Sequence, residues 1–385
     1  MIARMFKWGA MSLPFCFLLA SCATEKQSHD GLYEVAFDTN PPIHVLAERR
    51  SDSWIVRNGE ERIAMKRLHN GMHQVPVFGG SWAGTWEKGR CLGVWTDSLR
   101  PNDYKVAFTC TPIDIQQVET TPTETTHWDT SEGLMTLKQR GDSLWGTIAT
   151  PTGDYRYLAG TRSQDKCRLQ TFDGAHLFGF FFDISGEDSL KGSFISGSHY
   201  VTDFGGVLST PTDKPSLSNT YQTVDNQSFV LSGVGMNGQE ISMEFNEHQG
   251  PMVVDIMGSW CPNCMDETRL LTELSEAYPH VPIVTLAYER ATGEDAIRRL
   301  QAFQAEMNMS WPVILAGPAS KQHASDQFPI LNGVQSFPTT LFWGGPSACV
   351  VHSGFSGPAT GEGYKEEQRL FRAQFQRLND LMETR

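Results

Sequence analysis

The sequence predicts two kinds of folded region: an N-terminal all-β part, either a sandwich or barrel-like, followed by a C-terminal α/β part with a mixed sheet. The first half contains short runs of aromatic and β-branched residues between Gly, Asn, Asp and Pro clusters, without helical periodicity. The second half alternates apolar, strand-like runs with amphipathic, helix-like ones. A chain of 385 residues also exceeds one ordinary hydrophobic core.

The β-rich part is predicted to span residues 31–209. Residues 43–48, 53–56 and 144–148 show the partial apolar alternation expected of strands that have one buried face. A linker is predicted at residues 210–226, because this stretch begins with a run rich in Pro, Ser and Thr. The β-rich part carries no motif that assigns it a function.

The C-terminal part is predicted to span residues 227–385 and to alternate strands with helices. A hairpin is expected at 228–243, strands at 252–257 and 281–288, and helices at 264–278 and 294–307. A closing antiparallel pair is expected at 339–343 and 349–353, with a last helix at 364–382. Parallel strands joined by helices and closed by a hairpin give a mixed sheet.

The N-terminus is predicted to be a targeting segment. Two basic residues precede a 12-residue apolar stretch at 8–19, which is too short to span a bilayer and ends in a Leu-Ala-Ser-Cys run. This run resembles a bacterial lipobox, which implies a signal peptide at 1–21, lipidation of Cys22 and a tether at 22–30. The alternative is an ordinary secretory signal that contains a Cys. The expected location is the bacterial cell envelope, lipid-anchored and facing the periplasm or extracytoplasmic side.

Charge and composition exclude one class of partner. The formal net charge is −13, whereas nucleic-acid readers need clustered Lys and Arg, so we expect no nucleic-acid ligand. Export also sets the environment of the cysteines that remain after Cys22. Cys91 and Cys110 lie in neighbouring strand-like runs and could form a structural bridge, whereas Cys167 and Cys349 are expected to be buried, unpaired thiols.

The strongest chemical signal is the Cys-Pro-Asn-Cys motif from Cys261 to Cys264. A c-type haem site needs His directly after the second Cys, where Met265 stands, and the C-terminal part offers no second ligand pair for zinc. The motif lies between an apolar strand and a helix, so the N-terminal end of that helix would favour a thiolate. We predict that Cys261, at the exposed end, attacks and that Cys264 resolves the mixed disulfide, with no cofactor beyond this redox-active pair and no metal.

Two segments give the motif a family context. Residues 254–267 resemble the active-site segment of TlpA/ResA-type thioredoxin-like lipoproteins, and residues 336–340 resemble the cis-proline loop of that family. The resemblance covers residues 227–385 and implies a thioredoxin fold with a redox-active Cys261–Cys264 disulfide. It also implies that Phe337 and Pro338 contact the substrate. Trp260, directly before the first Cys, is expected to shield the dithiol and contact the substrate, or else to be a packing residue.

Two acidic residues are also candidate site residues. Asp255 stands six residues before Cys261, where thioredoxin keeps a buried acid beneath the second Cys. A buried carboxyl has a raised pKa and could take the proton of Cys264, although Asp255 could instead be a solvated strand-end residue. Glu267 matches the family's acid three residues after the motif, and its alternative role is to complement the helix dipole.

The resemblance implies a membrane-anchored thiol–disulfide oxidoreductase, and within that class we expect a protein-disulfide reductase. Its partners would be disulfide-containing proteins as substrates and a membrane thiol electron donor. Two alternatives remain at this point: a peroxiredoxin-like peroxidase, and a ligand-binding lipoprotein in which the redoxin part is an accessory. The membrane that holds the anchor, the oligomeric state and the substrate are not specified by the sequence.

Overall fold

A computed structural model describes most of the chain after the predicted targeting segment. The described residues are 29–100, 104–114, 121–186, 188–210, 220, 222–223 and 227–384. The predicted signal peptide, Cys22, most of the tether and most of the linker therefore lie outside the described residues. None of the helices within these ranges is both long and apolar enough to cross a membrane.

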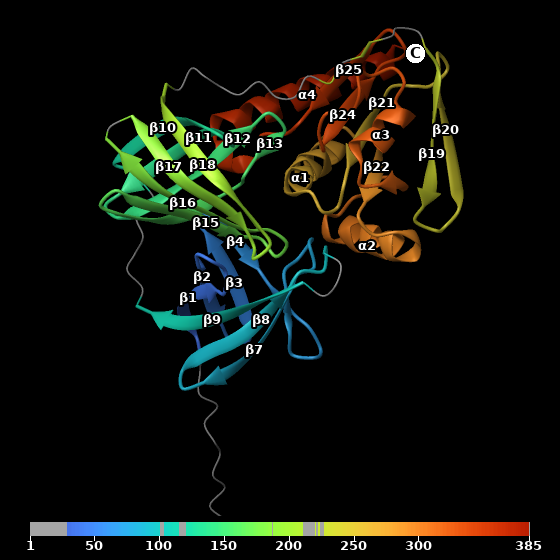
Figure 1. Ribbon diagram of the computed structural model, residues 1–385. Coiled ribbons are helices and arrows are strands. Elements are labelled where there is room, and N and C mark those ends of the chain that lie inside the picture. Colours follow the sequence, from blue (N-terminus) through green and yellow to red (C-terminus); the bar gives the residue numbers. More distant parts are fainter. Residues whose placement is uncertain are drawn as a thin grey trace, which may run out of the picture.

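The first nine strands form an antiparallel sheet that curls into a barrel-like shape (Figure 1). They are β1 (Gly31–Phe37), β2 (Ile43–Arg50), β3 (Ser53–Asn58), β4 (Glu61–Ala64), β5 (Lys66–Arg67), β6 (His73–Gln74), β7 (Ser81–Glu87), β8 (Arg90–Thr96) and β9 (Lys105–Ile113). The order is β4-β3-β2-β1-β9-β8-β7-β6-β5, so the two edge strands are separated in the chain only by Met65. The Met65 N–H donates to the Trp54 carbonyl at 2.8 Å, which draws the two edges together.

The next nine strands form a second antiparallel sheet, which closes. They are β10 (Glu124–Thr130), β11 (Gly133–Arg140), β12 (Ser143–Thr150), β13 (Gly153–Asp154), β14 (Leu158–Ser163), β15 (Lys166–Phe172), β16 (Leu177–Ser185), β17 (Ser189–Ser196) and β18 (Tyr200–Ser209). Because β10 pairs with both β11 and β18, and β11 pairs with β12, all strands except the short β13 form a ring. Large apolar side chains fill its interior, among them Trp128, Phe180 and Phe204.

The residues expected to form one β-rich part thus hold two barrels with separate cores. The barrels contact each other through β2 and β3 of the first and β15 of the second. At this junction the side-chain amide of Asn58 donates to the Phe172 carbonyl at 2.9 Å and accepts from the Phe172 N–H at 3.2 Å. Phe172 belongs to the core of the first barrel, so the two barrels share packing as well as hydrogen bonds.

The C-terminal region is a seven-stranded mixed sheet flanked by helices. Its strands are β19 (Phe229–Gly235), β20 (Glu240–Phe245), β21 (Met252–Met257), β22 (Ile283–Glu289), β23 (Val313–Pro318), β24 (Thr339–Trp343) and β25 (Cys349–Ser353). Its helices are α1 (Pro262–Ala277), α2 (Gly293–Glu306), α3 (Lys321–Gln327), the short 3₁₀ helix η1 (Pro358–Thr360) and α4 (Glu362–Glu383). The order is β20-β19-β23-β22-β21-β24-β25, in which β21, β22 and β23 run parallel.

The expected mixed sheet is confirmed, including the hairpin β19–β20 and the closing pair β24–β25. Every residue of the central strand β21 is buried, as its continuous apolar run predicts. The sequence prediction omitted β23 and α3. Strand β23 pairs with both β19 and β22, and so joins the β19–β20 hairpin to the centre of the sheet.

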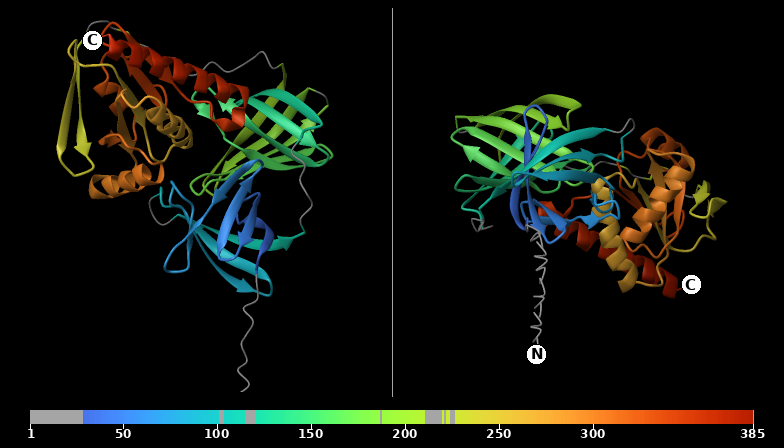
Figure 2. Two further views of the ribbon diagram at one scale, coloured as in Figure 1. Left: turned by 180° about the vertical axis from the view of Figure 1, so that it is seen from behind. Right: turned by 90° about the horizontal axis from the view of Figure 1, so that it is seen from below.

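The β-rich region packs against the end of the C-terminal sheet where α1 begins (Figures 1 and 2). Phe78, Leu99 and Ala175 of the β-rich region are buried in the same apolar cluster as Cys261 and Met265. The helix η1, directly before α4, contacts β12 of the second barrel. The start of α1, where the Cys-Pro-Asn-Cys motif lies, is therefore an internal surface of the molecule.

Candidate redox site

Cys261 is the N-cap residue of α1. Its Sγ accepts the backbone N–H of Cys264 at 3.2 Å, and Pro262 takes the first helical position, where no N–H is needed. The N–H donor and the positive end of the helix dipole both stabilise negative charge on this sulfur. The local sequence therefore directs the Cys261 thiol into the position where a thiolate is best supported.

The proline loop lies against the same sulfur. The Phe337–Pro338 peptide bond is cis, the geometry expected from the sequence, and the Cys261 thiol is 3.5 Å from the Phe337 carbonyl oxygen. The Cys261 sulfur thus lies between the helix end and the loop that opens β24. Residues 76 positions apart in the chain are brought together here by the pairing of β21 with β24.

Trp260 is held beside the proline loop by three contacts. Its indole N–H donates to the Tyr288 carbonyl at 2.9 Å, and its ring meets the Phe337 ring edge-on at a centroid distance of 5.8 Å. The Arg290 guanidinium lies 4.4 Å from the centroid of the Trp260 ring, a cation–π contact. Trp260 is only partly buried, so the structure places it as a packed wall of the site with one face still accessible.

Two buried carboxyls lie beneath the dithiol. Burial raises the pKa of Asp255 to about 7, although the Thr285 hydroxyl, which donates to Asp255 Oδ2 at 2.8 Å, opposes the shift. Burial and then the charge of Asp255 raise the pKa of Glu267 well above its usual range, while Thr340 donates a hydrogen bond to it. Each residue is 1% exposed, so Asp255 is a buried, hydrogen-bonded acid and not a solvated one, and Glu267 is buried within α1.

Cys264 lies deeper than Cys261. Its side chain is 1% exposed, and burial together with its hydrogen bond to Cys261 raises its pKa well above the usual value for a thiol. The charge of Asp255 acts in the same direction, which places this carboxyl within electrostatic reach of the thiol. A proton on Cys264 therefore has a buried carboxylate nearby to receive it.

The expected exposure of Cys261 is wrong, because the second barrel covers it. Cys261 is 5% exposed and faces a cavity of about 380 Å³. The C-terminal region contributes Cys261, Pro262, Asn263 and Phe337 to the cavity lining. The second barrel contributes the rest: Glu132, Thr150, Thr152, Asp154, Tyr155, Arg156, Thr171, Asp173, His176 and Phe178.

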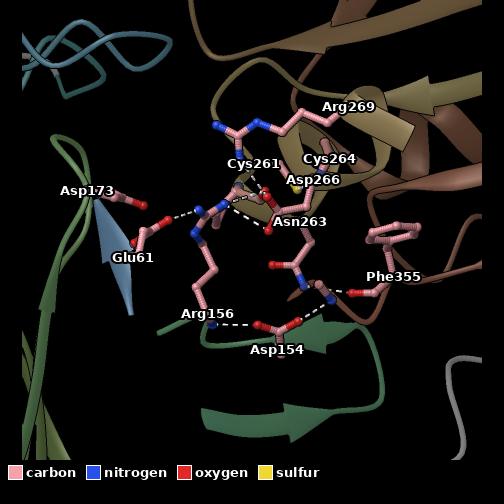
Figure 3. A network of polar contacts seen from close by, with 12 residues as sticks. Glu61, Asp154, Arg156, Asp173, Cys261, Asn263, Cys264, Asp266, Arg269 and Phe355 are labelled. Atoms are coloured by element: carbon pink, nitrogen blue, oxygen red, sulfur yellow. Dashed lines mark hydrogen bonds and ion pairs between the residues drawn. The ribbon is translucent and has the colours of Figure 1, made fainter. Parts of the chain in front are cut away.

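A buried ionic network ties the barrel to the redox motif (Figure 3). The Arg156 guanidinium donates to Asp266 Oδ2 at 2.9 Å and to the Pro262 carbonyl at 3.4 Å, and it also pairs with Glu61. Arg156 and Asp266 are almost fully buried, so losing either partner would leave an uncompensated charge in a dry interface. The network therefore connects the first barrel, the second barrel and α1.

Asp154 makes a second link between the barrel and the C-terminal region. Its carboxylate accepts the backbone N–H of Gly357 and the backbone N–H of Arg156, each at 2.5 Å. Burial, and then the charge of Asp266, raise the pKa of Asp154 to about 7. On the other side of the interface, the Asn263 side chain donates to the Phe355 carbonyl at 3.1 Å.

Gly153 allows the closest approach between the two parts. It has a φ of +146°, and a Cβ at this position would lie 1.6 Å from the side-chain nitrogen of Asn263. Only a residue without a side chain lets the barrel backbone touch the second variable residue of the motif at this distance. Gly153 lies within the segment 153–160, and nothing local to that segment identifies Asn263 as its partner.

Asp173 and His176 form a pair on the barrel side of the cavity. The His176 Nδ1 lies 2.9 Å from Asp173 Oδ2, and the Asp173 carboxylate also accepts the backbone N–H groups of Ala175 and His176. Burial would raise the pKa of Asp173, but the charge and hydrogen bond of His176 outweigh it and lower that pKa. This pair fixes the turn between β15 and β16 beside the redox motif.

Comparisons with known proteins found resemblances among solved structures, and these cover less than half of the chain. No model of a protein family matches the chain, and no curated protein sequence matches it. Solved structures that resemble it are thioredoxin-like thiol:disulfide oxidoreductases and related proteins. A putative thiol:disulfide interchange protein DsbE from Chlorobium tepidum is 17% identical, with a TM-score of 0.28 over 40% of this chain and 98% of that one.

Two further structures show the same partial coverage. StoA from Bacillus subtilis is 16% identical with a TM-score of 0.26, covering 36% of this chain and 94% of that one. The peroxidoxin BcpB from Mycobacterium tuberculosis is 15% identical with a TM-score of 0.26, covering 38% of this chain and 96% of that one. In each case less than half of this chain is covered, at 15–17% identity.

Proposed function

We propose that the chain is a thiol–disulfide oxidoreductase in which Cys261 is the nucleophile, Cys264 is the resolving thiol, and the physiological direction is reduction. One observation carries the proposal. The Cys261 sulfur accepts the backbone N–H of Cys264 in the first turn of α1 at 3.2 Å, lies 3.5 Å from the carbonyl of the cis-proline loop, and faces a cavity. A nucleophilic thiolate needs this combination of an electropositive site and an approach path.

The reaction transfers two electrons to the substrate disulfide. The Cys261 thiolate attacks one substrate sulfur, the substrate S–S bond breaks, and the first substrate thiol leaves with a proton. The Cys264 thiolate then attacks the Cys261 sulfur, which releases the second substrate thiol and leaves the Cys261–Cys264 disulfide. The second step requires Cys264 to lose its proton, and Asp255 is the buried carboxylate within electrostatic reach of that thiol.

Regeneration and location follow from the same proposal. The Cys261–Cys264 disulfide must be reduced again, and a membrane thiol electron donor is the proposed source of electrons. Lipidation of Cys22 would anchor the protein in the bacterial cell envelope, on the side that faces away from the cytoplasm. The reducing direction rests on the family resemblance and on Asn263, which supplies no positive charge to stabilise the thiolate further.

A trapping experiment tests the two thiol roles. The chain from residue 23 onward is reduced, freed of reductant and mixed with excess hydroxyethyl disulfide, and the products are measured by mass spectrometry. The Cys264→Ser protein should accumulate the mixed disulfide on Cys261, whereas the wild-type protein should pass on to the Cys261–Cys264 disulfide. A Cys261→Ser protein that still reduces the disulfide at the wild-type rate would overturn the proposal.

A further inference from the structure

We propose that the mouth of the second barrel is the substrate-binding wall of the redox site, and that the substrate is a low-molecular-weight disulfide. This inference rests on the proposed thiol–disulfide chemistry and narrows it. Protein disulfides, the substrates expected from the sequence, would then require the barrel to move away from α1. Three features of the molecule support this inference: the restricted access to Cys261, the strength of the contacts between the barrel and α1, and the size of the remaining cavity.

Access to the nucleophile is restricted from the side that a substrate must use. A disulfide has to reach the Cys261 sulfur, which lies beside the Phe337 carbonyl. Asp154 of β13 and the following Tyr155 and Arg156 line the cavity that Cys261 faces, and Cys261 itself is 5% exposed. A folded protein presents its disulfide on a surface much wider than this opening, and such a surface would collide with the barrel.

The barrel is docked by contacts that are costly to break. Arg156 and Asp266 form an ion pair whose side chains are 7% and 2% exposed, and removing one partner of such a pair is strongly destabilising because it leaves a buried charge unpaired. The Asp154 carboxylate accepts the Gly357 N–H at 2.5 Å across the same interface. Gly153 brings the barrel backbone against the side chain of Asn263. These contacts are specific and buried, so they hold the second barrel in a fixed position beside the redox motif.

Apolar contacts extend the wall beyond the cavity. Phe78 and Leu99 of the first barrel and Ala175 of the second are buried in the cluster that contains Cys261, Cys264 and Met265. Separating the barrels from α1 would expose these side chains to water, which opposes opening. The closed arrangement is therefore the state in which the dithiol must meet its substrate.

The cavity that remains suits a small molecule. Its volume of about 380 Å³ lies within the usual range of small-ligand pockets, roughly 300–1,000 Å³. Tyr155, Phe178 and Phe337 supply apolar faces, and Glu132 and Thr152 supply polar atoms. Polar side chains make up much of the lining, and the reactive sulfur forms part of it, so the pocket offers hydrogen-bonding groups beside apolar faces.

The test compares a small disulfide with a protein disulfide. Turnover of hydroxyethyl disulfide and of insulin is measured with dithiothreitol as reductant, for the wild-type chain from residue 23 onward and for Arg156→Met. Arg168→Met is the matched control, because Arg168 lies on the same barrel but pairs within the β-rich region, donating to Thr161 Oγ1 at 2.8 Å and making a long ion pair with Glu34. The wild-type protein should reduce insulin at least tenfold more slowly than hydroxyethyl disulfide.

Loosening the wall should change this selectivity. In Arg156→Met the insulin rate should rise at least tenfold, while Arg168→Met should retain the wild-type ratio. Gly153→Ser provides a second variant, because its side chain would push the barrel away from Asn263 without removing a charge. A wild-type protein that reduces insulin as fast as hydroxyethyl disulfide would overturn the inference but not the redox chemistry. Cys261→Ser should lose reduction of both hydroxyethyl disulfide and insulin. This control separates a failure of the proposed redox chemistry from a failure of the proposed substrate selectivity.

A labelling measurement needs no variant. The reduced wild-type protein is treated with iodoacetamide or with a maleimide carrying a 5-kDa polyethylene glycol, and the modified cysteine is identified by mass spectrometry. The small reagent fits the cavity beside Cys261, whereas we expect the bulk of the polymer to hinder the large one until the protein is unfolded. Equal modification by both reagents in the native protein would contradict the inference.

Discussion

Two pairs of neighbouring thiols in this chain differ in almost everything except their burial. Cys261 and Cys264 are 5% and 1% exposed, and Cys91 and Cys110 are 5% and 0% exposed. The first pair is built on the start of a helix and faces a cavity. The second pair joins β8 and β9, where Cys91 stands directly opposite Cys110 inside the aromatic core of the first barrel.

The comparison shows that the environment, and not proximity, determines what a thiol pair can do. Cys261 receives a backbone N–H from the end of α1, and its partner Cys264 lies near the carboxyl of Asp255. The hydrogen bond to Cys91, and then burial, raise the pKa of Cys110 far above its usual range. We therefore expect the first pair to be a redox centre and the second to be structural.

The largest expected effect comes from removing a thiol of each pair. Cys261→Ser should lower the rate of disulfide reduction by at least about a thousandfold, because Cys264, the other thiol of the site, is more deeply buried and has a raised pKa. Cys110→Ser should leave that rate within about twofold of wild type, since the substitution lies outside the site. The measurement is turnover of hydroxyethyl disulfide by both variants. A large loss in Cys110→Ser with an intact fold would break the comparison.

A smaller effect should come from the buried acid beneath the dithiol. Asp255 has a pKa of about 7, so it can accept a proton from Cys264 only above that pH. The rate of release from the mixed disulfide should therefore rise as the pH increases through about 7 in the wild-type protein. Asp255→Asn should flatten this rise and slow release by about a hundredfold, the usual scale of general-base catalysis.

The pH profile of single-turnover release, followed by rapid mixing, tests this role. Asp183→Asn is the matched control, because Asp183 lies on the exposed outside of the second barrel and pairs with Lys166. An unchanged pH profile in Asp255→Asn would assign the rise to another group, of which Glu267 is the nearest candidate.

The Cys91–Cys110 pair should affect stability instead of turnover. Its residues face each other in register, so mild oxidation with a small disulfide should close a Cys91–Cys110 bond. Closing a loop of this length should raise the free energy of unfolding by about 3 kcal/mol. The check is denaturant unfolding of oxidised and reduced Cys261→Ser/Cys264→Ser protein, with Cys110→Ser added as the control that cannot form the bond. An unchanged free energy of unfolding after oxidation would show that Cys91 and Cys110 stay free thiols.

The smallest expected effect concerns the charge of the substrate. Glu132 lines the cavity and accepts the Tyr155 hydroxyl at 2.5 Å, and among the described residues no basic side chain pairs with it. A positively charged small disulfide such as cystamine should therefore react two- to fivefold faster than an anionic one, about 1 kcal/mol or less at a partly exposed site. Glu132→Gln should remove the preference for the cationic disulfide. Competition between the cationic and anionic disulfides measures this preference. The same preference in wild type and variant would exclude Glu132 from substrate recognition.

Much of the C-terminal region could be predicted because its signals are local. The apolar run of β21, the periodicity of α1 and α4 and the pair β24–β25 each fall close to the predicted bounds. The relation between Cys261 and Pro338 was also accessible, since both residues lie in recognisable segments. The short helix α3 was not predicted, nor was β23, whose Gly317 and Pro318 interrupt the apolar run.

The covered face of the site could not be predicted, because its contacts join distant parts of the chain. Arg156 and Asp266 are 110 positions apart, and Asp154 and Gly357 are 203 apart. No periodicity or motif links such pairs, so Cys261 looked like an exposed helix end. The two barrels were not separated either, because strands of both show the same alternation of buried and exposed residues.

A redox titration that reports each cysteine separately tests the division between the two pairs most directly. The chain from residue 23 onward is equilibrated in graded dithiothreitol buffers, alkylated, and analysed by peptide mass spectrometry. Cys261 and Cys264 should titrate together as one two-electron couple at or below about −270 mV, the potential of thioredoxin. Titration of this pair near about −120 mV, the range of strong oxidants, would contradict the proposed reducing direction. A Cys91–Cys110 disulfide that is reduced more readily than the Cys261–Cys264 disulfide would contradict the division into a structural pair and a redox pair.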